Sequence, residues 1–471
     1  MDTNKLNTIY RSRYLLTGLI LITSCSLYAQ ERKTNKPDSS FNELGRNFNK
    51  LTATSHKKEL SLNEAIALAR QQNKWIETAK MEELASREDK KDARLAALPQ
   101  LQINASYQRF SKLAVFKDGL GDVSSMNRYP TANQANAGIE GAFTIYGGGR
   151  INELQLEQSI KSDLASLNTQ DQTGNISLQT AAYYLDLMRL NDLKKFITDQ
   201  EKRAELRLKN INAFYRNQKV TRSDVLRAEV MLSNVSLNLI QTENDISITS
   251  QKLEVLLNLP KYTGILTTDT FDRIKPQLLA LSALLDTRGE TAFSVLKADK
   301  TIGLQQSRLN LVKSNNLPAL SFFTAYGLNY PNYLLSPPTD QLYAIGFVGI
   351  KAQYNISSLY HNKAKKAAAK WRLEGAKIQK ESVLDNTQQE IESYYIKYME
   401  ALNRIDVNEK SIKQAEANYK ITSTKYFNQL ALLTDLLDAD YLFQESRFNL
   451  IKAQADAIMI YYRMLYAAGK L

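Results

Sequence analysis

The sequence has little proline, glycine, cysteine and histidine for its length. Its 471 residues include 9 prolines and 18 glycines, so long helices can run without the residues that most often break them. Cys25 is the only cysteine, which excludes a disulfide within the chain. With two histidines and no zinc-binding, catalytic-triad or nucleotide-binding motif, the sequence gives no basis for an enzyme and predicts no cofactor or metal.

Long apolar runs are also missing after the N-terminal segment. No later stretch reaches 18 apolar residues, which excludes a membrane-spanning helix there. Residues 1–29 have the pattern of a signal peptide, with basic residues before an apolar run at Tyr14–Ser24. Cleavage after Ala29 fits ordinary signal peptidase. Alternatively, Ile22–Ser24 resembles the start of a lipobox that would leave Cys25 acylated. Both alternatives predict export.

The balance of charge is basic, with 61 Lys and Arg against 49 Asp and Glu. A basic surface can serve nucleic acid, anionic lipid or acidic cargo. Because the chain is predicted to be exported, we expect no nucleic-acid partner. The densest basic run lies at Lys363–Lys380, and such a run is typical of a solvated helix face.

The chain contains two copies of one unit. The segment YRNQKVTRSDVLRA at Tyr215–Ala228 matches YFNQLALLTDLLDA at Tyr426–Ala439, which lies 211 residues further on. Ala137–Ile145 matches Val348–Ile356 at the same distance. The copies differ in length within Ser111–Gln134, which predicts an exposed loop there.

Four segments of about ten residues alternate between apolar and polar residues. They are Leu101–Gln108, Ala135–Ile145, Leu320–Leu328 and Val348–Ile356. The alternation predicts strands with one apolar face, and their length matches membrane-spanning strands. Strands of a soluble sheet are the alternative, but those are usually shorter. Because lipid does not tolerate open strand edges, a membrane sheet would need strands from other copies. Two copies would give eight strands and three would give twelve.

Very long helices are predicted next to these strands. A capping box at Ser61–Glu64 begins a helix that extends to about Ala97. A second helix is predicted from about Ile151 to Arg216, where apolar residues recur every three or four positions without proline. A helix of that length needs a partner along its whole length, which we expect to be the helix into which it turns back. Each matched polar segment is then the tip of an antiparallel hairpin.

Both tips share the same predicted parts. An Asn-Gln pair ends one helix, a threonine caps the next helix, and an aspartate in its first turn favours the helix dipole. In the first tip these residues are Asn217, Gln218, Thr221 (or Ser223 as the cap) and Asp224, and in the second they are Asn428, Gln429, Thr434 and Asp435.

This two-copy layout resembles the TolC family of outer-membrane efflux ducts. The resemblance is carried by LSLNEAIALARQQN, LAALPQLQINASYQ, FTIYGGGRI, NLPALSFFTAYG, VGIKAQYNISSLYHNKAK and the two tips, which together cover nearly all of Leu60–Leu471. It implies a mainly helical fold with a membrane β-barrel of twelve strands, four from each chain of a homotrimer. Coiled-coil hairpins would form a tunnel in the periplasm, below a barrel surrounded by outer-membrane lipid.

The same resemblance implies partners and a pore entrance. A periplasmic adaptor and an inner-membrane transporter would dock at the tips, as in efflux or type I secretion. The family carries two aspartates on its second tip, and the matching residues here are Asp435 and Asp438. In a trimer they would form an acidic ring of six carboxylates that favours cations. The family's tip arginine is Ala431 in this chain, and its tip glycines are glutamines.

Residues of the tips are therefore expected to contact the adaptor or to gate the entrance. Tyr426 matches one member of the polar links that join neighbouring tips in the family. The full set expected to serve in contact or gating is Tyr215, Asn217, Gln218, Thr221, Asp224, Tyr426, Asn428, Gln429 and Thr434.

The expected division of the chain follows from the repeat. Residues 30–58 form a polar segment after the signal peptide, 59–260 the first copy, 261–290 a connection and 291–471 the second copy. The leading interpretation is a passive exit duct of undetermined cargo. A periplasmic coiled-coil adaptor or scaffold is one alternative, although it leaves the strands unexplained. A surface receptor that uses the loops at 111–134 and 329–342 is another.

Overall fold

The computed structural model describes residues 57–116, 119–271, 285 and 289–471. The predicted signal peptide, Cys25 and nearly all of the predicted N-terminal segment lie outside the described residues. No helix in the described part of the chain is long and apolar enough to cross a membrane.

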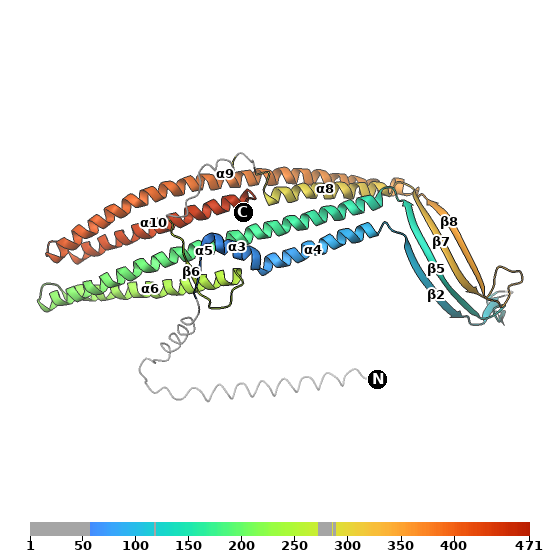
Figure 1. Ribbon diagram of the computed structural model, residues 1–471, viewed down its shortest axis with the longest axis horizontal. Helices are drawn as coiled ribbons and strands as arrows, with labels where there is room; N and C mark the ends of the chain where they lie inside the picture. The colour runs from blue at the N-terminus through green and yellow to red at the C-terminus, as the bar shows by residue number, and fades with distance from the viewer. Residues whose placement is uncertain (1–56, 117–118, 272–284, 286–288) are drawn as a thin grey trace, which may run out of the picture. The chain divides into compact units, whose positions relative to one another are not determined.

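Helices make up most of the described chain (Figure 1). They are α3 (Leu62–Gln72), α4 (Lys74–Leu95), α5 (Arg150–Arg216), α6 (Arg222–Leu256), α8 (Phe293–Ser314), α9 (Ser358–Phe427) and α10 (Leu433–Ala467). The strands are β1 (Lys58–Leu60), β2 (Gln100–Arg109), β3 (Leu113–Phe116), β4 (Val123–Met126), β5 (Asn133–Tyr146), β6 (Ile265–Thr267), β7 (Ala319–Tyr330) and β8 (Tyr343–Gln353).

The two long hairpins predicted from the sequence are present. Helix α5 has 67 residues and turns back into α6, while α9 has 70 residues and turns back into α10. The helices of each hairpin lie side by side (Figure 1), and α10 also packs against α5. Shorter helices complete the layer, because α4 lies along α5, and α8 lies between α5 and α9.

The first predicted helix is wrong in one respect, because it is divided at Asn73. Helix α3 ends at Gln72 and α4 begins at Lys74. Asn73 is extended, and its side-chain oxygen accepts the N–H of Trp75 at 2.9 Å. Its Nδ2 donates to the carbonyl oxygen of Leu256 at 2.9 Å. An asparagine that caps the second helix and binds α6 therefore breaks the first.

Four of the strands form one antiparallel sheet in the order β2-β5-β7-β8. A strand of the first copy thus lies beside a strand of the second, with Ile139 paired to both Ile103 and Tyr326. These three side chains are 54 to 79% exposed on one apolar face. The prediction for the last strand is shifted, since β8 begins at Tyr343 and ends at Gln353 rather than covering 348–356.

The opposite face of the sheet is polar along β2 and β5, with side chains such as Gln102 and Glu140. Two aromatic side chains, Phe323 and Phe347, stand on this face along β7 and β8, with ring centroids 5.9 Å apart. The predicted loop at 111–134 contains a small hairpin of β3 and β4.

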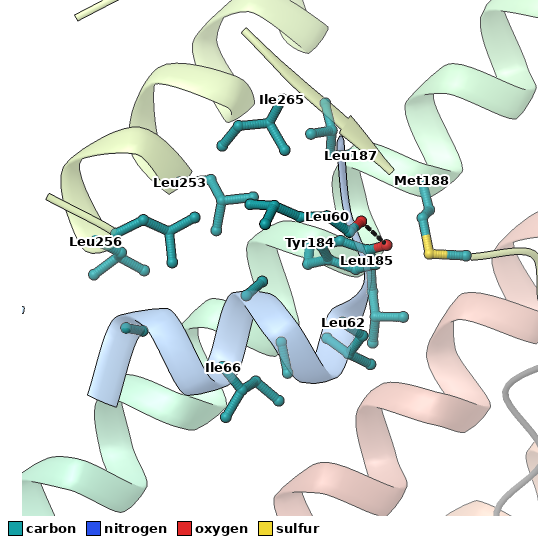
Figure 2. Close-up of a cluster of buried hydrophobic side chains, with 14 of the residues drawn as sticks. Leu60, Leu62, Ile66, Tyr184, Leu185, Leu187, Met188, Leu253, Leu256 and Ile265 are labelled. Carbon is teal, nitrogen blue, oxygen red and sulfur yellow. Dashed lines mark hydrogen bonds between the residues drawn. The ribbon is translucent and has the colours of Figure 1, made fainter. Parts of the chain in front are cut away.

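A compact core joins the first copy to the connection between the copies (Figure 2). Strand β1 pairs in parallel with β6, and α3 packs against α5 beside them. Tyr184 is fully buried there, and its hydroxyl donates to the carbonyl oxygen of Leu60 at 2.8 Å. The same hydroxyl lies 3.0 Å from a carboxylate oxygen of Asp269, which also accepts the N–H of Leu62. Burial and the charge of Asp269 raise the pKa of Tyr184.

Removing the Tyr184 hydroxyl tests whether these hydrogen bonds hold the core together. Tyr184→Phe leaves a buried carbonyl oxygen with one partner fewer, so we expect it to lower the free energy of unfolding by about 1–3 kcal/mol. Urea unfolding in detergent measures this change. Tyr183→Phe is the matched control, since Tyr183 is half-buried and its hydroxyl makes no hydrogen bond to the described residues. Equal stability of the two variants would contradict the expectation.

Candidate functional site

The two hairpin tips of one chain pack against each other. Ile211, Val225 and Ala228 of the first tip form a buried cluster with Tyr426, Leu433, Leu436 and Leu437 of the second. In the second tip the apolar residues are three and four positions apart, so they share one side of α10. The tips therefore form one apolar unit within the chain, and the polar residues around it are held in fixed positions.

The turns of both tips have the same backbone geometry. Asn217 and Asn428 end α5 and α9, as the repeat predicts. The next residues, Gln218 and Gln429, have φ angles of 57° and 63°. This left-handed conformation is where glycine or asparagine usually ends a helix. The glutamines adopt it without glycine, because the N–H of the following residue returns to the helix, as in Lys219 to Phe214 at 2.9 Å.

The predicted helix caps are confirmed in one tip and wrong in the other. Thr221 caps α6, and Asp224 returns the interaction by accepting the Thr221 N–H at 2.9 Å. Thr434 does not cap α10, because the helix begins at Leu433 and its cap position is Leu432. The Leu432 N–H donates to Asp435 at 3.0 Å. Asp435 can satisfy this amide without help from a capping hydroxyl, which frees the helix to start before Thr434.

Asp435 and Asp438 both lie exposed on α10. They are three positions apart and so lie on the same side of the helix. Leu436 and Leu437 between them are buried in the tip cluster. Within the described residues neither carboxylate forms an ion pair. The structure thus presents two solvated negative charges beside the tip core.

A cavity of about 370 Å³ lies between the tips. Asp224 of the first hairpin and Tyr426 of the second both line it. Tyr426 is 5% exposed, and its hydroxyl has no hydrogen-bond partner among the described residues. Burial raises the pKa of Tyr426, and the charge of Asp224 raises it further. The other lining residues are Phe214, Lys219, Val220, Thr221, Gln429, Ala431, Leu432, Leu433 and Thr434.

Five predicted contact residues are exposed at or beside the turns, and one of them, Gln429, also lines the cavity. Tyr215 is 41% exposed, and Asn217, Gln218, Asn428 and Gln429 are exposed at the turns. Leu430 and Leu432 beside them are apolar and 77 and 69% exposed. The end of the paired hairpins therefore offers both amide and apolar groups to a partner.

One interaction of this region escapes prediction from the sequence. Arg207 on α5 forms an ion pair with Asp440 on α10, with 2.5 Å between Nη2 and Oδ2. Their side chains are 7 and 6% exposed. Burial alone would lower the pKa of Arg207, but the Asp440 carboxylate outweighs it and the pKa is raised. The only signal in the sequence is that Asp440 continues the apolar stripe of Leu433 and Leu436, at helical spacing.

Aromatic rings also pack along this interface of α5, α9 and α10. Phe196 of α5 and Phe443 of α10 meet edge to face at 6.3 Å between ring centroids, and Tyr419 of α9 stacks on Phe443 at 6.0 Å. The guanidinium of Arg203 lies 5.9 Å from both phenylalanine rings. Two of its nitrogens and one Asp440 oxygen lack hydrogen-bond partners among the described residues. Buried charge is therefore concentrated where the hairpins of one chain meet.

The carboxylates of the tips raise the question of a metal site. No group of three or more residues that could hold a metal ion occurs in the part of the chain that the structure describes. The arrangement can bind a partner, present negative charge and hold two hairpins together.

A double-mutant cycle tests what the buried ion pair contributes. Arg207→Met or Asp440→Leu alone leaves an unpaired buried charge, so we expect each to cost about 3–5 kcal/mol of stability. Replacing both residues should cost much less than the sum. Denaturant unfolding in detergent measures all four proteins. Lys194 and Glu243 join α5 to α6 at 2.8 Å on the surface and serve as control, with an expected coupling of about 1 kcal/mol or less. Additive costs at Arg207 and Asp440 would contradict the expectation.

No protein-family model matches the chain, and no curated protein sequence matches it significantly. Solved structures do match. The outer membrane protein VceC of Vibrio cholerae is 16% identical, with a TM-score of 0.73 over 87% of this chain and 96% of that one. The CmeC outer membrane channel of Campylobacter jejuni is 15% identical, with a TM-score of 0.74 over 94% and 90%.

The MtrE outer membrane channel of Neisseria gonorrhoeae, in its open state, gives a TM-score of 0.69 at 16% identity, over 87% of this chain and 88% of that one. Each match covers most of both chains, so it includes the sheet and the hairpins together. The chain therefore has the TolC-like fold of outer-membrane channels.

Proposed function

We propose that the protein is the outer-membrane exit duct of a tripartite efflux or secretion system. The observation that carries this proposal is the four-stranded sheet, which has an exposed apolar face and is joined to two long hairpins. Three chains would share one barrel and one helical tunnel, through which cargo passes without chemistry. The channels that share this fold support the proposal.

The edges of the sheet support a shared barrel. Strands β2 and β8 are the outer strands of the order β2-β5-β7-β8, so each has one side without a partner strand among the described residues. In lipid every backbone amide and carbonyl needs a hydrogen-bond partner. Pairing β2 of one chain with β8 of the next would satisfy both edges. Repeated around a threefold axis, it closes twelve strands.

An unpartnered seam on α6 supports contact between chains in the tunnel. Leu226, Val230, Leu237 and Ile240 are 47 to 59% exposed. Their spacing places them on one side of α6, away from the side that Val235 and its buried neighbours turn toward α5. Such a stripe is stable when another helix covers it, as in a coiled coil. A neighbouring chain supplies that helix in the proposed trimer.

The tips are proposed as the pore entrance and as the docking site for a periplasmic adaptor and its inner-membrane transporter. The exposed Asp435 and Asp438 of three chains would form the acidic ring at the entrance. The exposed turns, with Leu430 and Leu432 beside them, would face the adaptor. A scaffold without a membrane part is less well supported, because it would leave the apolar face of the sheet in water.

Neutralising the acidic ring tests the proposed entrance. We expect the double variant Asp435→Asn, Asp438→Asn to lower the preference of the channel for cations over anions by about tenfold, because a ring of one sign concentrates counter-ions. Reversal potentials across planar bilayers measure this preference. Asp406→Asn on α9 is the control, since Asp406 is exposed and distant from the tips in sequence.

Two results would count against this assignment. An unchanged cation preference would contradict the proposed acidic ring but not the proposed duct. The absence of any conductance from the unmodified protein, inserted in the same bilayers, would count against the duct.

A further inference from the structure

We propose that a basic face at the start of α9 binds the phosphate groups of anionic phospholipids in the leaflet nearest the helices. This inference rests on the proposed function, because it requires the sheet to lie in the membrane. The basic face consists of Lys363, Lys366 and Lys370, which are all exposed. Their spacing of three and four positions places them on one side of the helix.

Two other sides of α9 are already occupied. Ala369 and Leu373 are buried against Leu309 of α8. His361 and Lys365 line a cavity of about 1020 Å³ at the junction of sheet and helices. At 100° per residue, the basic face lies on neither of these sides. It is therefore open to whatever surrounds the protein at this level.

The position of the cavity indicates that the basic face of α9 lies on the same side of the protein as the apolar face of the sheet. Thr144 and Gln353 line the cavity, and the strand register places both on the polar face, with Glu140. The basic face lies away from the cavity, so it continues the apolar face. On β8 that apolar face includes Val348 and Ile350, which are 73 and 68% exposed. A lipid that covers these two residues would have its headgroup near the start of α9.

The distance of these lysines from the start of α9 agrees with the thickness of the headgroup layer. At 1.5 Å per residue from Ser358, Lys363 lies about 8 Å along α9 and Lys366 about 12 Å. The headgroup layer extends about 5–8 Å beyond the hydrocarbon on each side of a bilayer. Lysine side chains bend toward phosphates over several ångströms. Tyr360, which is 60% exposed one turn earlier, is of the type that lies at membrane interfaces.

Ion pairing distinguishes this face from the end of the basic run on the same helix. Further from the sheet, Lys377 pairs with Glu374 at 3.0 Å and Lys380 pairs with Asp299 at 2.6 Å. Among the described residues, no carboxylate lies within ion-pair distance of Lys363, Lys366 or Lys370. Within the basic run at Lys363–Lys380, the lysines nearest the apolar face thus carry charge that no described carboxylate compensates. An anionic headgroup complements it.

The test compares two pairs of lysines on the same helix. Lys363→Gln, Lys366→Gln removes charge from the basic face. Lys410→Gln, Lys413→Gln is the matched control, because these lysines are also exposed, three positions apart and without an ion pair among the described residues. The full chain, in neutral detergent, is equilibrated with equal amounts of dioleoyl phosphatidylglycerol and dioleoyl phosphatidylcholine. Native mass spectrometry then counts each bound lipid.

We expect the unmodified protein and the control to retain mainly phosphatidylglycerol. In the variant of the basic face this preference should fall roughly 25-fold, at about fivefold for each of the two lysines. Equal retention of both lipids by the unmodified protein would overturn the inference, and so would an unchanged preference in the variant.

The same experiment distinguishes a failure of this inference from a failure of the proposed function. A protein that retains neither lipid and stays soluble without detergent has no sheet in a membrane, so both proposals would fall. A protein that needs detergent and retains the two lipids equally would refute only the selective headgroup site. Binding of an acidic periplasmic protein in place of lipid would also appear as equal retention.

Discussion

The need to pair every backbone amide of the sheet is the constraint on which the rest of the structure depends. In the part of the chain that the structure describes, the largest sheet has four strands, two open edges and one exposed apolar face. Such a sheet is stable neither in water, because of its face, nor in lipid as a single chain, because of its edges. The proposed association of three chains would resolve both problems together. Each copy of the tandem repeat supplies two strands and one hairpin, so one chain contributes to both the sheet and the helical layer.

The helices obey a related constraint. A helix of 67 or 70 residues is not stable unless another surface covers its apolar side. Within the chain, α6 and α10 cover part of α5 and α9, and the tip cluster around Tyr426 joins the two hairpins. The buried pair of Arg207 and Asp440 adds a polar contact to this interface. A buried ion pair contributes little net stability but penalises arrangements that separate its members, so it favours one alignment of the two hairpins.

Local patterns of the sequence predicted the elements, whereas contacts between distant residues decided the details. Alternation predicted all four strands, the last with shifted bounds, and the repeated tip predicted both hairpin turns and the cap at Thr221. The break at Asn73 depends on a bond to Leu256, 183 positions away, which no local pattern reveals. Asp440 resembles its neighbour Asp438 in sequence, yet only Asp440 meets an arginine, on α5. Predictions about gating and docking residues concern contacts between chains and stay predictions.

The measurement that tests the shared barrel most directly is the mass and location of the extracted protein. Inner and outer membranes are separated, the protein is extracted in mild detergent, and light scattering gives the protein mass of the particle. We expect the protein only in the outer-membrane fraction, with three times the mass of one mature chain. A particle of single-chain mass, or release without detergent, would contradict the shared barrel and leave the four strands as part of a soluble sheet.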